Sequence, residues 1–267
     1  MQRPGLLVLS VLCVLTLGLP ALAQQAEAPP AGERDTQAEV LLRSSCASLA
    51  ALRSYSFQAD VSQDYAYPSG DKVQVSKQIQ VFVQRPDRFR SDVEGDDVSS
   101  VTVYDGKALT MLDRDKMVYG VVEVSGSTDA VLRNLLEKYD IEAPLANLVY
   151  GDPCATVSLE GVTAKYLGLH MAAGRSCHHL AFFGPEQNWQ IWVDEADGLP
   201  RKLVITDKGL PGWPQFHAVI TEWKTARKYP AGFFTFTPPK GARQAPVLPI
   251  PTPAQAPAPA PAPAPAQ

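Results

Sequence analysis

Four histidines, His170, His178, His179 and His217, are the side chains best suited to bind a metal or transfer a proton near neutral pH. His178 and His179 are adjacent in the sequence. Neighbouring residues on a strand point to opposite faces, so these two imidazoles cannot easily share one metal ion. Cys177 precedes them, but the three side chains could form a metal cluster only if both imidazoles pointed to the same side. The spacing therefore argues against a metal site, and we expect no cofactor.

Paired carboxylates offer the other route to chemistry, through general acid-base catalysis. Asp96 stands beside Asp97, and Asp113 stands two residues before Asp115. Both pairs fall in expected turns, where aspartate is favoured for local hydrogen bonding. The sequence also contains no H-E-x-x-H, G-x-S-x-G, P-loop or dinucleotide-binding glycine pattern. We therefore predict a protein that is not an enzyme, with a hydrolase kept only as a distant alternative.

Arg85 is a charged side chain in an unexpected place. It follows a stretch in which Val73, Val75, Lys77, Ile79, Val81 and Val83 alternate with mostly polar residues, which is the pattern of a strand with one dry face. The alternation puts Arg85 at the end of that dry face, directly before Pro86. A guanidinium there is costly unless it is hydrogen-bonded. Two interpretations are open: Arg85 donates to carbonyls of a helical lid, or it reaches solvent where the strand ends.

Two helical segments are available as such a lid. Residues 36–54 place Val40, Leu41, Cys46, Leu49 and Leu52 at near-helical spacing, with Thr36 or Asp35 as the cap. Residues 127–149 place Val131, Leu132, Leu135 and Leu136 in helical register, with Ser127 or Thr128 as the cap and Pro144 as a break.

The rest of the domain alternates with period two. We predict strands at 55–67, 73–84, 100–105, 108–113, 117–124, 163–171, 176–183, 188–194, 201–207, 216–224 and 234–237. Inward-facing side chains on these strands should include Phe57, Tyr65, Tyr67, Trp189, Ile191, Val193, Phe216, Ala218, Ile220, Phe234 and Phe236. The fold class is α+β, with about 10 or 11 mainly antiparallel strands that curl. Two helices cover little of so wide a sheet, which predicts an apolar cavity on its concave face.

The two ends of the chain lie outside this domain of residues 36–245. Residues 1–23 combine one basic residue, an apolar run and Ala21-Leu22-Ala23, which indicates a secretory signal peptide. A membrane anchor is the alternative, but Pro20 closes the run and no basic cluster follows. Residues 24–35 are expected to form a flexible lead, and the Ala-Pro repeat of 246–267 an extended, semi-rigid tail.

Charge and cysteine content limit the partners and the disulfides that can be expected. Loss of residues 1–23 removes Arg3 and leaves 23 basic against 28 acidic residues, without a basic block, so nucleic acid is not an expected partner. In an oxidising compartment two of the three remaining cysteines can pair. Cys154 and Cys177 would bracket a hairpin region, whereas Cys46 reads as a small buried thiol on its helix. Spacing alone leaves the pairing open.

Four motifs, in order, carry a family resemblance: VFVQRPDRFR (81–90), VYDGKALTMLDRDKMVY (103–119), DEADGLPRKLVITD (194–207) and FFTFTPPKGA (233–242). Together they resemble the LolA-like lipoprotein carriers of the Gram-negative periplasm, over about residues 38–242. The set CHHLAF…WQIWVDEADGLPRKLVIT is most similar to an uncharacterised branch described as predicted periplasmic proteins. The resemblance implies an unclosed β-barrel, lined by apolar side chains and covered by helices, that holds acyl chains.

In the carriers, the arginine of the Arg-Pro pair hydrogen-bonds lid backbone in the closed state, which favours the lid interpretation for Arg85. Relatives with this fold include a lipid-responsive regulator of envelope stress and mycobacterial lipid-binding lipoproteins. Two departures put specific lipoprotein delivery in doubt. Segment 127–149 is longer and more charged than the carrier's lid, and the Ala-Pro tail has no counterpart there.

We therefore predict an exported, monomeric periplasmic protein that binds a lipid or a lipoprotein acyl chain, as a carrier or an envelope sensor. The alternative is a non-catalytic interaction module with a self-filled core and a protein partner in the cell envelope. The expected lid-anchoring and ligand-binding residues are Arg85, Ile79, Val81, Val83, Phe57, Trp189, Ile191, Leu132, Leu135 and Leu136.

Overall fold

A computed structural model describes residues 35–249, apart from residues 142, 144 and 156. The expected signal peptide, nearly all of the flexible lead and most of the Ala-Pro tail lie outside the described residues.

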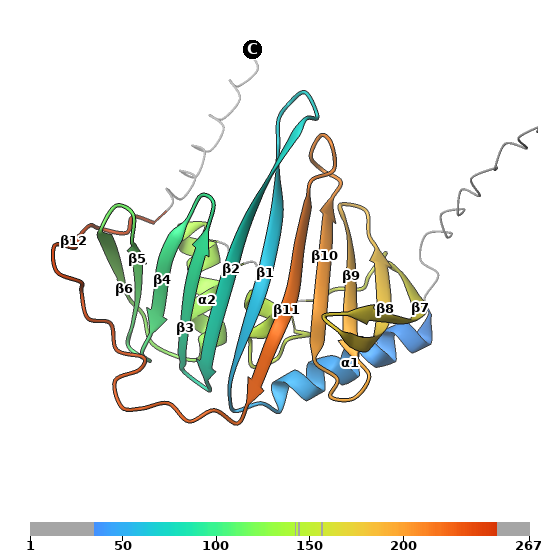
Figure 1. Cartoon of the computed structure of the whole chain (residues 1–267), viewed down its shortest axis with the longest axis horizontal. Coiled ribbons are helices and arrows are strands. Elements are labelled where there is room, and N and C mark those ends of the chain that lie inside the picture. The colour runs from blue at the N-terminus through green and yellow to red at the C-terminus, as the bar shows by residue number, and fades with distance from the viewer. Residues whose placement is uncertain (1–34, 142, 144, 156, 250–267) are drawn as a thin grey trace, which may run out of the picture.

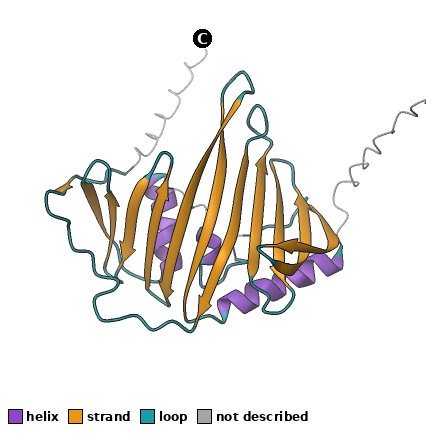
Figure 2. Cartoon of the chain, viewed as in Figure 1, coloured by secondary structure: helices purple, strands orange, loops and turns teal. Residues whose placement is uncertain are grey.

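Twelve strands form one sheet that does not close on itself (Figures 1 and 2). Along the chain they are β1 (Ser54–Ala66), β2 (Lys72–Gln84), β3 (Arg88–Gly95), β4 (Ser99–Tyr104), β5 (Ala108–Asp113), β6 (Val118–Glu123), β7 (Thr163–Ala172), β8 (Arg175–Phe183), β9 (Gln187–Asp194), β10 (Pro200–Asp207), β11 (Gln215–Thr225) and β12 (Arg243–Gln244). Their order across the sheet is β12-β6-β5-β4-β3-β2-β1-β11-β10-β9-β8-β7. Neighbouring strands are antiparallel except for β12 beside β6. The predicted α+β fold with an unclosed antiparallel sheet is confirmed.

Strand register shows that the helices cover one face of this sheet. Ile79 lies opposite Ala59, and Ala59 lies opposite Ile220, so these three side chains share a face. That inner face meets α1 (Thr36–Ala50), α2 (Thr128–Tyr139) and the short 3-10 helix η1 (Ala146–Leu148). Helix α1 contacts β7, β8 and β9, whereas α2 lies over β2 to β5 (Figure 1). The two helices therefore divide the inner face between them.

Both helices begin at side-chain caps that the sequence contained. Asp35 accepts from the Gln37 N–H at the start of α1, and Ser127 accepts from the Ala130 N–H at the start of α2. The predicted apolar face of α1 is correct for Leu49, which is buried, but wrong for Val40, which is 58 % exposed. The buried face also includes Ala38, Leu42 and Ser45, which were not predicted. Small Ala38 and Ser45 allow close approach to the sheet, and they do not stand out as apolar positions in a hydropathy pattern.

The outer face of the sheet, opposite the helices, is partly covered by the C-terminal segment. From β11 the chain runs along one end of the strands and then beside β6 (Figure 1). The predicted strand at 234–237 is wrong, since these residues form turns and extended chain. Phe234 packs instead in an outer-face cluster with Phe82, Val101, Val103 and Leu112. A second dry face explains why Phe82 interrupts the polar side of the alternating strand.

Strand β3 was not predicted, although Phe89, Ser91 and Val93 alternate with Arg90, Asp92 and Glu94. The charged residues on its outer side hid the alternation. Arg90 and Arg114 both pair with Asp92 on that outer side. Phe89, Ser91 and Val93 line the concave face on the inner side. Within residues 35–249, as described, no helix is long and apolar enough to cross a membrane.

Candidate functional site

A cavity of about 280 Å³ lies between α1 and the strands β9 to β11. We call it the α1 cavity. Its floor on the sheet is formed by Trp189, Ile191, Leu203, Ile205 and Ile220. Leu42 and Leu49 of α1, together with residues of the segment 145–158, close it from above. No charged side chain belongs to its lining, so the space suits an apolar occupant.

A second cavity, of about 220 Å³, lies between α2 and the strands β2 to β5. We call it the α2 cavity. Ile79, Val81, Phe89, Val93 and Met111 contribute its apolar floor, to which Ser91, Ser100 and Thr102 add hydroxyl groups. Leu132 and Leu135 of α2 cover it. Its lining, too, contains no charged side chain.

The segment around η1 separates the two cavities. Leu145 lines both of them, Leu148 lines the α1 cavity and Val149 lines the α2 cavity. The Tyr55 hydroxyl on β1 donates to the Leu148 carbonyl at 2.7 Å, which fixes this partition to the centre of the sheet. Burial raises the pKa of Tyr55, although nearby Arg85 opposes the shift, so the phenol keeps its proton at neutral pH.

Arg85 connects the end of α1 and the loop after η1 to the sheet. Its Nη1 atom donates to the carbonyls of Leu49 and Ala50, both at 2.9 Å, at the end of α1. The same atom donates to the Leu52 carbonyl at 3.0 Å. Its Nη2 atom donates to the Tyr150 carbonyl beyond η1 and to the Tyr55 hydroxyl. The guanidinium thus serves carbonyls from a helix end and a loop, which are the acceptors that the lid interpretation requires.

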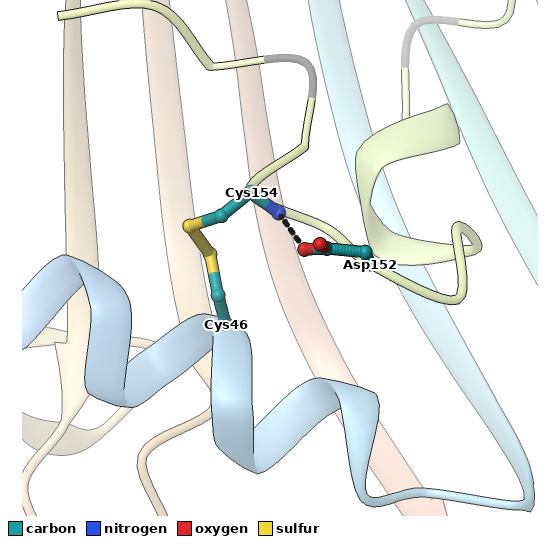
Figure 3. Close-up of a disulfide and its surroundings, with 3 residues drawn as sticks. All are labelled: Cys46, Asp152 and Cys154. Carbon is teal, nitrogen blue, oxygen red and sulfur yellow. Dashed lines mark hydrogen bonds between the residues drawn. A yellow bond between two sulfur atoms is a disulfide. The ribbon is translucent and has the colours of Figure 1, made fainter.

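The disulfide joins Cys46 to Cys154, with Cα atoms 5.8 Å apart (Figure 3). The predicted pairing of Cys154 with Cys177 is therefore wrong, and so is the interpretation of Cys46 as a buried thiol. Cys46 lies on α1, and Cys154 lies on the segment that covers the α1 cavity, where its N–H donates to Asp152 at 3.1 Å. The bond closes a sequence separation of 108 residues and ties the two covers of the α1 cavity together.

Cys177 cannot take part in that bond because it belongs to the other side of the sheet. It is free and fully buried in an outer-face cluster with Ala172, Trp192 and Val204. Burial raises the pKa of its thiol, which makes it an inert packing residue at neutral pH.

The structure separates the predicted site residues into three groups. Ile79, Val81, Leu132 and Leu135 line the α2 cavity, while Trp189 and Ile191 line the α1 cavity. Phe57 and Val83 are buried in the main core without lining either cavity. Leu136 is 46 % exposed on α2 and lines neither cavity. Tyr65 and Tyr67, which were predicted to face inward, are exposed near the end of β1.

Several lining residues were not singled out from the sequence. The most informative are Ser91, Ser100 and Thr102, whose small polar side chains do not stand out in a search for apolar alternation. They could have been found only from their positions, since each stands at a position of the period-two pattern whose side chain faces the helices. Leu203 and Ile205 carried the same period-two signal on β10.

None of the four histidines lines either cavity, and only His170 and His179 contact each other among the described residues. His178 bonds to the Tyr166 hydroxyl at 3.0 Å, while His170 and His179 contact each other through their Nδ1 atoms at 2.9 Å. His179 also stacks on Trp192 and bonds to Gln190 at 2.9 Å. Among the described residues, no three His, Cys, Asp or Glu side chains are placed to hold a metal ion. The linings of the two cavities offer contacts to apolar groups.

Solved structures with a similar strand arrangement are remote in sequence. An uncharacterised conserved protein from Thermus thermophilus has a TM-score of 0.47 and 12 % identity, covering 79 % of this chain and 99 % of that one. MucB of Pseudomonas aeruginosa, solved with MucA, has a TM-score of 0.44 and 14 % identity, covering 75 % of this chain and 61 % of that one. The LolA superfamily protein of Nitrosomonas europaea has a TM-score of 0.38 and 12 % identity, covering 74 % and 97 %.

None of the curated proteins matches the sequence. Residues 38–248 match the family described as "Predicted periplasmic protein (DUF2092)", which spans nearly all of the described domain. This agrees with the expected similarity to an uncharacterised branch of predicted periplasmic proteins, and it supports the expected periplasmic localisation. The chain belongs to the DUF2092 family of predicted periplasmic proteins.

Proposed function

We propose that this protein binds a lipid or an acyl chain in the periplasm, as a carrier or as a sensor of the envelope. The observation that carries the proposal is the pair of apolar cavities between the sheet and its helical coverings, neither of which is lined by a charged side chain. Ligand pockets are commonly about 300–1,000 Å³. Each cavity falls just below that range, so each matches a short hydrocarbon chain or one part of a larger lipid.

Arg85 supports the proposal through its position. Because it bonds to the end of α1 and to the loop after η1, one side chain holds these two segments against the sheet. We propose that Arg85 anchors the lid, and that the cavity-lining members of the predicted set contact the ligand.

Lipid identification on native material tests the proposal. The protein would be purified from the periplasm of its own host, and bound molecules would be identified by native mass spectrometry and organic extraction. In parallel, uptake of an uncharged, environment-sensitive apolar dye would be titrated. We expect a co-purifying lipid and saturable dye binding; the absence of both would refute the proposal.

Cavity-filling variants make the test specific. Leu203→Trp should block the α1 cavity and Ser100→Trp the α2 cavity, so each should lower dye binding. Gln78→Trp adds the same indole at an exposed position on the outer side of β2 and serves as the control. Equal dye binding by all three variants would place the dye outside the cavities and contradict the proposed site.

A protein-interaction role is the second candidate, because β7 is an edge strand with exposed apolar side chains. Leu167, Leu169 and Met171 are all exposed on it. The double variant Leu169→Lys/Met171→Lys should abolish capture of an envelope partner while dye binding is retained. Capture that is unaffected by this variant would exclude the β7 surface from the interaction.

A further inference from the structure

The floor of the α2 cavity carries three hydroxyl groups that share one small area. Ser91 on β3 lies directly opposite Thr102 on β4, and Ser100 lies two residues before Thr102 on the same face. All three line the cavity beneath Leu132 and Leu135 of α2. The hydroxyls therefore form a polar patch inside a largely apolar space.

These hydroxyls have no hydrogen-bond partner among the described residues, although each can donate one bond and accept two. Ser99, their neighbour on the outer side of β4, provides the contrast, because its hydroxyl donates to Glu94 Oε2 at 2.8 Å. The three residues are half-buried and line the cavity beneath α2. The inner hydroxyls therefore have unused bonding capacity that points into the α2 cavity.

The floor of the α1 cavity lacks this feature. The strands contribute Trp189, Ile191, Leu203, Ile205 and Ile220 there, and all are apolar. The polar side chains of its lining are Ser45, which is buried on α1 rather than on the floor, and Asn147, Ser158 and Gln187, which are exposed and so belong to its rim. The two cavities thus differ in the chemistry of their sheet side, and only one offers hydrogen bonds from the floor.

The absence of charged side chains from the lining further limits the class of ligand that the α2 cavity can bind. A carboxylate or phosphate taken into the α2 cavity would lose its hydration and meet no cation in the lining. The guanidinium of Arg85 is engaged by four carbonyls and the Tyr55 hydroxyl. Hydroxyls can satisfy an ester, an alcohol or an amide without a counterion. The lining therefore favours an uncharged group that contains oxygen.

We propose that the α2 cavity binds the uncharged, oxygen-bearing end of a neutral lipid, such as a long-chain alcohol or an acyl ester, through Ser91, Ser100 and Thr102. This inference rests on the proposed lipid-binding function and specifies its ligand class. Ionised fatty acids bind more weakly at the same site, because their charge is left unpaired.

The test compares 1-decanol with decanoate, which share one chain length, at a pH well above the carboxyl pKa of decanoate. Affinities for the mature protein would be measured by calorimetry and by displacement of the uncharged apolar dye. We expect decanol to bind about tenfold more tightly than decanoate, and the variant Ser91→Ala/Ser100→Ala/Thr102→Val to bind decanol about tenfold more weakly than the unmodified protein. Ser99→Ala, which removes a hydroxyl on the outer side of β4, is the matched control and should leave both decanol affinity and dye binding unchanged.

Two further measurements locate the ligand and check folding. Met111 lines the α2 cavity, so its methyl NMR signal should shift on addition of decanol, while those of Met117 and Met171 should not. The triple variant should be at least as stable to heat as the unmodified protein, because its hydroxyls have no partner to lose. A clearly less stable triple variant would show that these hydroxyls are bonded within the protein, which would overturn the inference.

The remaining outcomes separate this inference from the proposed function. If the unmodified protein binds the dye but binds decanol and decanoate equally well, the hydroxyl subsite is overturned and lipid binding still stands. The same holds if the triple variant binds decanol as tightly as the unmodified protein. Binding of neither dye nor decanol by the unmodified protein would overturn both.

Discussion

The α1 and α2 coverings lie on the same face of one sheet, but they are fastened to it differently. Helix α1 is bound covalently to segment 150–158 through Cys46 and Cys154. Its start is also held at the sheet edge, where the Asp35 N–H donates to the Ala164 carbonyl and the Asp35 carboxylate accepts from the Tyr166 N–H.

Helix α2 is held by hydrogen bonds and packing. Its first residue, Thr128, donates to the Pro86 carbonyl through its N–H at 2.9 Å and its hydroxyl at 3.1 Å. The Gly126 carbonyl accepts from the Tyr104 hydroxyl, and the Asp129 carboxylate accepts from the Gly151 N–H. These bonds cluster at the N-terminal end of α2, so its C-terminal end depends on the packing of Leu132 and Leu135.

The difference suggests a division of roles between the two coverings. A covalently closed cover keeps its apolar space shielded, whereas a cover held by separate hydrogen bonds can open locally at a lower free-energy cost. We therefore expect ligand exchange to take place on the α2 side, where the floor also provides hydroxyl groups. The predictions below test this contrast, in order of decreasing effect.

Removal of the disulfide should have the largest effect. Cys46→Ser/Cys154→Ser should lower the free energy of unfolding by about 4 kcal/mol, because a bond that closes a loop of roughly this length strongly restricts the unfolded chain. Denaturant unfolding would measure the loss, and hydrogen exchange should show α1 amides exchanging as early as those of α2. Cys177→Ala, which removes a thiol outside the bond, is the control. Equal stability of the oxidised protein and the double variant would show that the link contributes nothing.

Arg85→Leu should come next. We expect a loss of about 3 kcal/mol in the free energy of unfolding, because the carbonyls of Leu49, Ala50, Leu52 and Tyr150 lose their common donor. The loss should be accompanied by faster dye release. Arg85→Lys keeps the charge but cannot reproduce the planar donor geometry, so it should restore only part of the stability. If the Arg85→Leu variant unfolded with the same free energy and released the dye at the same rate, the guanidinium would not hold the end of α1 and the loop after η1 in place.

Asp194→Asn tests the half of the sheet on the α1 side, because Asp194 ends β9 and accepts from Arg175 of β8 and Arg201 of β10. Burial raises the pKa of Asp194, but hydrogen bonds from Arg175, the Ala196 N–H and Arg201 outweigh this and hold it below the usual aspartate range. The ionised group therefore stabilises the fold above a pH of about 4 and loses that effect as pH falls through its lowered pKa.

At neutral pH, Asp194→Asn should lower the free energy of unfolding by about 2 kcal/mol through weakened bonds to Arg201 and Arg175. The gap to the unmodified protein should narrow as the solution is acidified, which thermal unfolding across pH would show. Asp97→Asn, an exposed turn residue, is the control. A gap that stays constant down to strongly acidic pH would contradict the linkage.

Leu136→Ala should have the smallest effect, at about 0.5 kcal/mol or less, because this side chain is exposed on α2. Dye binding and ligand selectivity should not change. The buried neighbour Leu135 covers the α2 cavity, so Leu135→Ala should alter both. A strong effect of Leu136→Ala on ligand affinity would mean that α2 presents a different face to its ligand.

Local pattern was sufficient for most elements of this fold. Period-two alternation located β1, β2 and the strands from β7 to β11, and the caps at Asp35 and Ser127 were among the predicted ones. Sequence alternation mispredicted the structure where side chains on the outer face of the sheet also make contacts. The charged pairs on β3 hid a strand, and the aromatic residues at 234–237 suggested a strand where they cover the outer face instead.

The candidate site was predictable in part for the same reason. Apolar lining residues such as Ile79, Val81 and Ile191 follow from their position on the inner phase of a strand. The hydroxyl patch did not follow, because serine and threonine fit either face of a strand. Its meaning depends on what lies above it, and helix α2 arrives there from a segment some 30 residues further along the chain.

The sequence by itself determined the strand and helix types, the inner phase of most strands and the presence of a guanidinium at the end of a dry face. Those properties depend on residues close together in the chain. Only the tertiary structure decided that Cys46 pairs with Cys154, that Arg85 bonds to both the end of α1 and the loop after η1, and that the inner face is divided into two unlike cavities. Each of these depends on distances between residues far apart in sequence, and such distances are fixed only when the sheet curls and the helices pack against it.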